Sequence, residues 1–249
     1  MMGRPRLCWA AATLLCLVRA FSASAADPLP PRPGIVFVLD GAGGFEATSR
    51  FMSQTVAEEK FPLQVRTYHW THGFCRVISD QTHSTHIRRE SQKLVQLVLN
   101  CRHAAPGIPI YFVGHSAGCG VALRAAENLP PNTLERIVLL APAVSSKHDL
   151  RGALRSTCQG VDAFISNHDW CLLGLGTMLT GTTDRCWLTR AAGKSGFQPI
   201  VAGPEDEALY SKLRQYPWDS SLSWTGHKGG HYGAYQPGFL RMFVLPLLQ

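Results

Sequence analysis

The chain of 249 residues is poor in charge and has neither a long apolar run nor a CxxC pair. Charged residues make up 16% of it and hydrophobic ones 45%, which excludes a disordered protein, since disorder needs high charge and little apolar surface. No apolar stretch reaches the roughly 20 residues that cross a bilayer, so no stable membrane span is expected. The absence of CxxC pairs argues against a cysteine-based zinc or redox motif. A globular protein is expected.

The first 26 residues have the layout of a secretory signal peptide. A positively charged start precedes an apolar run over 7–18, and small residues follow over 22–26. We expect cleavage near Ala25 or Ala26. The mature protein is therefore predicted to be exported, as a secreted or periplasmic protein.

Removal of this leader leaves a Pro-rich spacer over 27–34 and one domain over 35–249. Three arginines leave with the leader, which lowers the formal charge from +7 to +4. That charge is too small and too scattered for a nucleic-acid-binding face, so no nucleic acid is expected as a partner. Six of the eight cysteines remain, and an even set outside the cytosol often pairs, although the sequence does not fix the connectivity.

Short apolar runs alternate with amphipathic segments along the domain. Wholly apolar runs such as 35–39 are typical of strands buried on both faces of a parallel sheet. Because helices separate such strands, we expect an α/β fold whose mostly parallel sheet is covered by helices on both faces. Strands are expected at 35–39, 63–69, 108–113, 137–140, 161–165 and 222–225, and helices at 46–60, 82–103, 117–129 and 237–248.

The pentapeptide Gly114-His115-Ser116-Ala117-Gly118 matches G-x-S-x-G, the nucleophile elbow. An apolar strand leads into it and an alanine-rich helix leads out. A strained strand-to-helix turn needs glycines where a Cβ would collide, and it lifts the serine hydroxyl above the sheet. The alternative is a glycine-rich connector with a solvated serine, which the flanking strand and helix disfavour.

With this motif the chain resembles the α/β-hydrolase superfamily of serine hydrolases, from Ile35 to the C-terminal helix. The resemblance implies a serine nucleophile followed along the chain by an acid and then a histidine. It implies cleavage of a carboxylic ester, thioester or amide through an acyl-enzyme at Ser116, on a small-molecule or lipid-like ester, without a cofactor or metal. Many relatives insert a helical cap where this chain has a short connection between 140 and 161, so little or no cap domain is expected.

The serine hydroxyl needs a base, and histidine suits this role because its pKa lies near neutrality. The resemblance implies a histidine on a loop before the final helix, which is where His231 lies. His227, four residues earlier, is the competing candidate. Glycines on both sides of His231 favour it, because they free the loop to aim the ring. The glycines between the two histidines also argue against a helical metal face.

A carboxylate must hold the imidazole in one tautomer. The resemblance implies an acid just past the second strand after the elbow, and Asp169 matches that position. Asp162 lies inside that strand, and Asp184 has an adjacent arginine, so both are weaker candidates. The order Ser116, Asp169, His231 then agrees with that of the family.

Acyl transfer puts negative charge on the carbonyl oxygen, so an oxyanion hole is also required. The resemblance implies one donor in the backbone N–H of Ala117 and a second in the loop after the first strand. Ala42 is the best candidate for the second donor, with Gly41 and Gly43 as alternatives. In this loop Asp40 stands where the family commonly has a histidine. The glycine spacing does not fit a nucleotide-binding G-x-G-x-x-G loop.

Two other function classes stay open at this point. The same triad serves an acyltransferase that passes the acyl group to an alcohol other than water, and the same fold serves a non-catalytic binding protein. The apolar segment 170–180 beside the proposed acid either lines an acyl pocket or belongs to the core.

Overall fold

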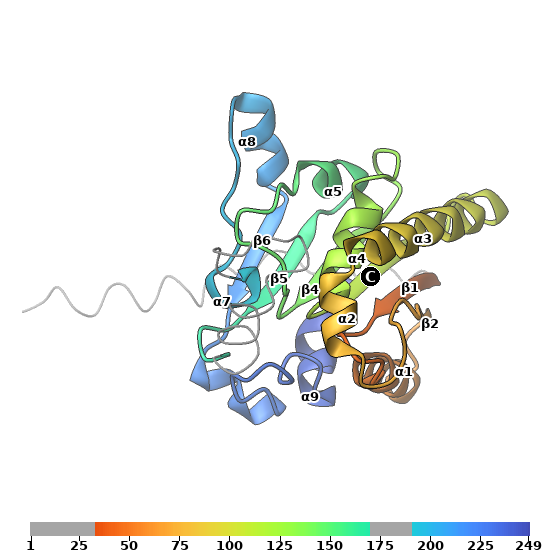
Figure 1. Ribbon diagram of the computed structural model, residues 1–249. Helices are drawn as coiled ribbons and strands as arrows, with labels where there is room; N and C mark the ends of the chain where they lie inside the picture. Colours follow the sequence, from red (N-terminus) through yellow and green to blue (C-terminus); the bar gives the residue numbers. More distant parts are fainter. Residues whose placement is uncertain (1–32, 170–190) are drawn as a thin grey trace, which may run out of the picture. The chain divides into compact units, whose positions relative to one another are not determined.

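The computed structural model describes residues 33–169 and 191–249, which belong to a unit that begins at Arg32. Within these residues the sheet has six parallel strands in the order β2-β1-β3-β4-β5-β6 (Figure 1). The order reverses between β1 and β3, and ligands of open α/β sheets bind beyond the carboxyl ends of strands at such a point. The strands are β1 (Gly34–Leu39), β2 (Leu63–Thr67), β3 (Ile110–His115), β4 (Arg136–Leu140), β5 (Val161–Ile165) and β6 (Leu213–Pro217).

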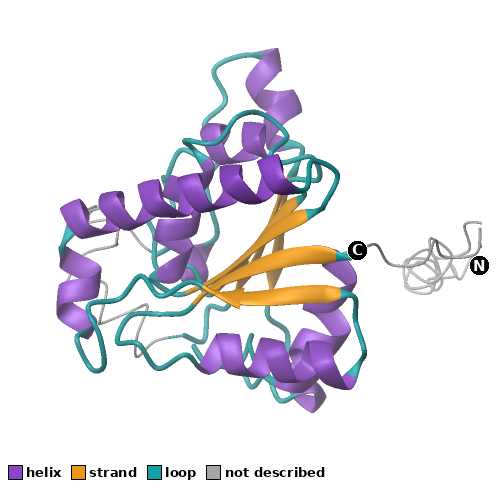
Figure 2. Cartoon of the chain, turned by 90° about the vertical axis from the view of Figure 1, so that its right-hand side faces the viewer, coloured by secondary structure: helices purple, strands orange, loops and turns teal. Residues whose placement is uncertain are grey.

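Helices cover both faces of this sheet (Figure 2). Side chains of β1 point to the two faces in turn. Phe37 and Leu39 pack in the core formed with α3 and α4, whereas Val36 and Val38 pack with α1 and the C-terminal helices. The helices are α1 (Ala47–Glu58), α2 (Val77–Thr82), α3 (Ser84–Ala104), α4 (Gly118–Ala126), α5 (Arg151–Ser156), α7 (Ala192–Ser195), α8 (Pro204–Tyr210), η3 (Ser220–Thr225), α9 (Pro237–Phe239), η4 (Leu240–Val244) and η5 (Leu245–Leu247).

The α/β class predicted from the sequence is confirmed, and one predicted strand is wrong. Residues 222–225 lie in the 3-10 helix η3, because the Asp219 carboxylate accepts a hydrogen bond from Ser221 N at 2.8 Å and so caps the start of a helical turn. The last strand is β6 instead. In the described residues, no helix has the length and apolar character that a bilayer crossing requires.

Four of the six cysteines expected in the mature chain are described, and all four are free thiols: Cys75, Cys101, Cys119 and Cys158. They do not form disulfides with one another, although an even number of cysteines in an exported protein often pairs. Cys119 is buried in α4 and Cys101 lies on α3, so packing rather than bonding accounts for these two. Cys171 and Cys186 lie outside the described residues.

Asp162 holds three neighbouring strands together at the β6 edge of the sheet. Its buried carboxylate accepts hydrogen bonds from Arg136 Nη1 of β4 at 2.7 Å, from Arg214 Nε of β6 at 2.7 Å and from the Tyr216 hydroxyl of β6 at 2.9 Å. Two guanidinium groups thus compensate a carboxylate that burial would otherwise make costly. Asp162 is a structural residue.

Asp162→Asn is expected to lower the free energy of unfolding by about 3–5 kcal/mol at pH 7, because it leaves the largely buried Arg136 without its anion. Urea unfolding measures this. The control is Asp149→Asn, which removes an ion pair with Arg151. The Asp149 side chain is 44% exposed, so this variant should lower the free energy of unfolding by less than about 1 kcal/mol.

The stability that Asp162→Asn loses should also depend on pH. Burial alone would raise the pKa of Asp162, but hydrogen bonds from Arg214 and Arg136 outweigh it and hold the pKa below its ordinary value of 3.8. A carboxyl whose pKa is depressed by folding contributes stability above its unfolded pKa, about 3.9, and loses it as the pH falls through the folded value. The difference between wild type and Asp162→Asn should therefore be full at pH 7 and shrink below about pH 4. The same difference at both ends of this range would contradict the assignment.

Candidate active site

Ser116 stands in the turn between β3 and α4 with a backbone φ of 52°, a left-handed conformation that few residues other than glycine adopt. Such a conformation costs about 1–3 kcal/mol and persists only where its surroundings enforce it. Here Ser116 N donates to Leu140 O at 2.9 Å, and Ser116 O accepts from Ala143 N at 3.1 Å. The end of β4 and the residues after it therefore hold the serine in its strained position.

The two glycines of the pentapeptide are required by close backbone contacts. A Cβ added at Gly118 would lie 2.3 Å from Leu39 O, and one added at Gly114 would lie 2.9 Å from Cys119 Cα. Neither backbone atom has room to move away, since one belongs to β1 and the other to α4. The G-x-S-x-G spacing thus follows from how tightly β1, β3 and α4 meet at this turn.

The structure brings His231 and Asp169 together. His231 Nδ1 lies 2.5 Å from Asp169 Oδ2, and both side chains are buried. Asp169 follows the end of β5, as predicted. With Nδ1–H donating to the carboxylate, the lone pair of the neutral imidazole is on Nε2, which is the arrangement that a general base needs.

His115 connects the loop of His231 to the elbow. The ring of His115 lies 4.9 Å from that of His231, and His115 Nε2 donates to the His231 carbonyl at 3.1 Å. Burial and the neighbouring His231 lower the pKa of His115 to about 3, so this ring stays neutral. Ser116 and His231 keep 7% and 8% of their surfaces exposed, so solvent reaches both.

The competing candidates have other surroundings. Asp162 is paired with two arginines, as described above. His227 is 4% exposed, its Nδ1 accepts from Gly229 N at 3.1 Å, and its ring packs against Phe239 at 4.8 Å. Asp184 and the apolar segment 170–180 lie outside the described residues.

The loop after β1 passes directly beside the elbow. A Cβ at Gly41 would lie 3.3 Å from Ser116 Cβ. Gly43 N donates to Asp80 Oδ2 at 2.8 Å, so this N–H is already engaged, which leaves Gly41 and Ala42 as candidate donors to a ligand. Ala117 is the N-cap residue of α4, where amides lie outside the helical ladder.

Two buried carboxylates hold this loop, and sequence reasoning assigned a role to neither. Asp40 Oδ1 accepts from Thr48 N at 2.7 Å and so caps α1. Asp80 in α2 accepts from Gly43 N, from His72 N at 2.7 Å and from His72 Nδ1 at 2.8 Å. Asp80 is 37 residues from Gly43 in the chain, so no local pattern could have indicated this contact.

Comparisons with known proteins identify the fold. No protein-family model matches the chain. Among curated proteins it is similar to a monoglyceride lipase homolog of monkeypox virus, with 26% identity over 121 residues, which cover 48% of this chain and 42% of the relative. The match thus spans less than half the length of that relative.

Solved structures of two esterases are similar along most of the chain. Esterase PE8 has a TM-score of 0.55 at 14% identity, covering 88% of this chain and 94% of its own. Esterase Pf2001 of Pyrococcus furiosus has a TM-score of 0.53 at 12% identity, covering 87% and 82%. The described residues show no large cap domain, and the chain adopts the α/β-hydrolase fold.

Proposed function

We propose that this protein is an exported serine hydrolase that cleaves carboxylic esters through an acyl-enzyme at Ser116. The observation that carries the proposal is the arrangement of a strained serine elbow beside the buried His231–Asp169 pair. The two similar esterase structures and the monoglyceride lipase homolog favour an ester over a thioester or amide. The layout of the first 26 residues supports export.

In the first half of the reaction, Ser116 Oγ attacks the ester carbonyl carbon while His231 Nε2 takes the hydroxyl proton. The Asp169 carboxylate holds the ring in the required tautomer and stabilises the imidazolium. The tetrahedral intermediate then expels the alcohol, which leaves with the proton from His231. In the second half a water, deprotonated by His231, attacks the acyl-enzyme; the bond between the acyl carbon and Ser116 Oγ then breaks, His231 returns its proton to Oγ, and the acid is released.

The negative charge of each tetrahedral intermediate needs two backbone donors. We assign these to Ala117 N at the start of α4 and to Ala42 N in the loop after β1. The N-terminus of α4 carries a partial positive charge that also favours the oxyanion. Gly43, an alternative from the sequence, is disfavoured because its N–H donates to Asp80.

A series of p-nitrophenyl esters of increasing chain length tests the proposal, with Ser116→Ala as the control. We expect the wild-type protein to hydrolyse at least part of the series and the variant to be inactive throughout. Wild-type rates no higher than those of the variant across the whole series would contradict ester hydrolysis.

Asp80→Asn is expected to lower kcat about 10-fold with little change in KM. Removal of an oxyanion donor lowers kcat by about 10²–10³-fold, and this variant has a smaller effect because it only loosens the loop that carries a donor. The carboxylate fixes Gly43, and an amide nitrogen turned toward Gly43 N would repel it. Steady-state kinetics with the best ester measure both constants. The exposed Asp149→Asn is the matched control, and an unchanged kcat in Asp80→Asn would show that the loop does not depend on this carboxylate.

A further inference from the structure

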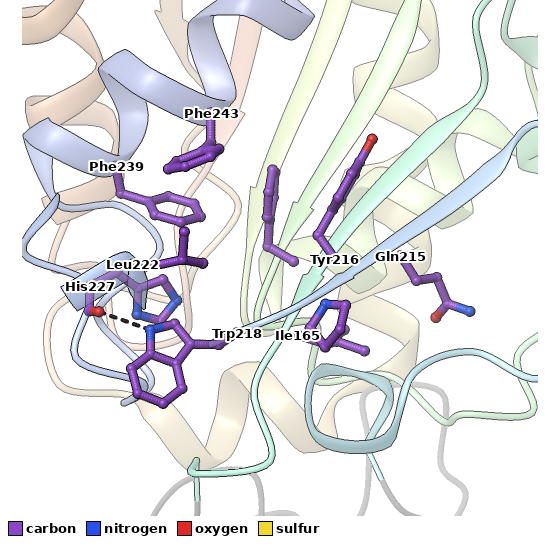
Figure 3. Close-up of a pocket in the computed structure, with 10 residues that line it drawn as sticks. Ile165, Gln215, Tyr216, Trp218, Leu222, His227, Phe239 and Phe243 are labelled. Carbon is purple, nitrogen blue, oxygen red and sulfur yellow. Dashed lines mark hydrogen bonds between the residues drawn. The ribbon is translucent and has the colours of Figure 1, made fainter. Parts of the chain in front are cut away.

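A cavity of about 200 Å³ lies beside the carboxyl ends of β5 and β6, against the C-terminal helices (Figure 3). Ser116, His231 and the candidate oxyanion donors are not among the residues that line it. Its walls are mainly aromatic and aliphatic, and the described lining includes no carboxylate, ammonium or guanidinium group. The lining residues on which the proposal depends are Phe164, Trp218, Leu222, His227, Phe239 and Phe243.

The aromatic side chains of the walls pack against one another. Phe239 makes edge-on contacts with Phe164 at 5.1 Å and with His227 at 4.8 Å, and it contacts Phe243 at 5.0 Å. Trp218 Nε1 donates to the His227 carbonyl at 2.8 Å, which fixes the indole at the side of the cavity. Preformed apolar walls of this kind are typical of small-molecule sites, which add only a few polar groups to set orientation.

His227 supplies such a polar group. Its Nδ1 accepts from Gly229 N, so in the neutral ring the proton is on Nε2. Within the described residues, no acceptor makes a hydrogen bond to Nε2, although the side chain is more than nine-tenths buried. The imidazole faces the cavity between Leu222 and Trp218 (Figure 3). Burial lowers the pKa of His227 to about 4 although Asp169 raises it, so the ring is neutral at pH 7.

We propose that this cavity binds a small neutral molecule with an aromatic or branched aliphatic body and one carbonyl oxygen, which accepts a hydrogen bond from His227 Nε2. The volume of the cavity limits the size of the ligand. An apolar cavity of about 150 Å³ holds benzene, so this one, at about 200 Å³, holds a benzene ring with a short substituent. The described lining has no charged group, which favours a neutral ligand, because an ion that gives up part of its hydration shell without gaining a partner is disfavoured. The site is separate from the ester chemistry proposed above and does not depend on it.

Three probes of nearly equal size test this assignment at pH 7: acetophenone has the carbonyl, cumene replaces it with a methyl-bearing carbon, and benzoate is anionic. Binding is measured by titration calorimetry on the full-length mature protein. We expect acetophenone to bind at one site with a Kd on the order of 1 mM or below. Benzoate should bind at least about 10-fold more weakly, because it must leave its hydration shell for an uncharged site.

The hydrogen bond is isolated by His227→Leu, which keeps a side chain of similar bulk without the donor. The affinity ratio of acetophenone to cumene should fall about 10-fold from wild type to this variant. An unchanged ratio, or equal binding of benzoate and acetophenone by the wild type, would overturn the proposal. So would the absence of acetophenone binding up to its solubility limit.

Location is tested by filling the cavity with Leu222→Trp, which should abolish binding of acetophenone and cumene alike. Binding that survives in this variant would place the probes elsewhere, for instance at Ser116, and overturn the proposal. If the variant does not fold, Phe243→Ala replaces it. This enlarged cavity should bind the longer propiophenone several-fold more tightly than the wild type does, and an unchanged affinity would count against the site.

Discussion

Ser116→Ala and His231→Ala are each expected to lower kcat on the best ester by about 10⁴–10⁶-fold. The hydroxyl attacks only when the imidazole takes its proton, so either substitution disables the same step. The double variant should therefore be hardly slower than either single variant. Initial rates measured at saturating substrate, with circular dichroism to verify folding, give all three values.

His227→Ala is the matched control for these variants, since it removes a buried histidine from the same loop, four residues away. Its kcat per folded molecule should stay within about 10-fold of wild type, because its ring packs on Phe239 and its Nδ1 already accepts a hydrogen bond from Gly229 N. Losses at Ser116 and His231 that multiply in the double variant would mean that the two residues do not act as a unit.

Asp169→Asn is expected to lower kcat by about 10⁴-fold while the local geometry is kept. The Asn amide would donate to His231 Nδ1, so the ring would carry its proton on Nε2, where it has no lone pair for the serine proton. Kinetics with the same ester measure the loss.

Asp162→Asn is the informative control for the acid, because this residue lies seven positions earlier in the same region of the chain. It should lose stability and keep a kcat per folded molecule close to wild type, since its partners are Arg136 and Arg214. A loss in Asp162→Asn as large as that in Asp169→Asn would contradict the assignment of Asp169 as the triad acid.

The central strands were predictable because burial on both faces leaves them wholly apolar, as in 35–39 and 137–140. The edge strand β6 was missed because its residues Leu213–Pro217 carry the polar partners of Asp162, so no apolar run marks it. The segment 222–225 alternates like a strand in sequence, yet a side-chain cap turns it into a helix. Polar contacts decided both cases, between distant residues in β6 and within a single turn at Asp219.

In the candidate site too, some features could be predicted from the sequence and others could not. The elbow was predictable because its glycines are dictated by local backbone contacts. His231 was favoured over His227 because glycines lie on both sides of it, and the structure adds its contact with Asp169, which is 62 residues away in the chain. The engagement of Gly43 by Asp80, which removes one candidate oxyanion donor, joins residues on separate elements and has no sequence pattern.

The most direct test of the proposed chemistry is reaction with a fluorophosphonate, which phosphonylates a serine only where an imidazole and an oxyanion hole activate it. Mass spectrometry of the labelled and digested protein locates the adduct. We expect one adduct per molecule, on Ser116, and none after His231→Ala or Asp169→Asn within the same reaction time. An unlabelled wild-type protein, or an adduct on a different residue, would contradict the proposed chemistry.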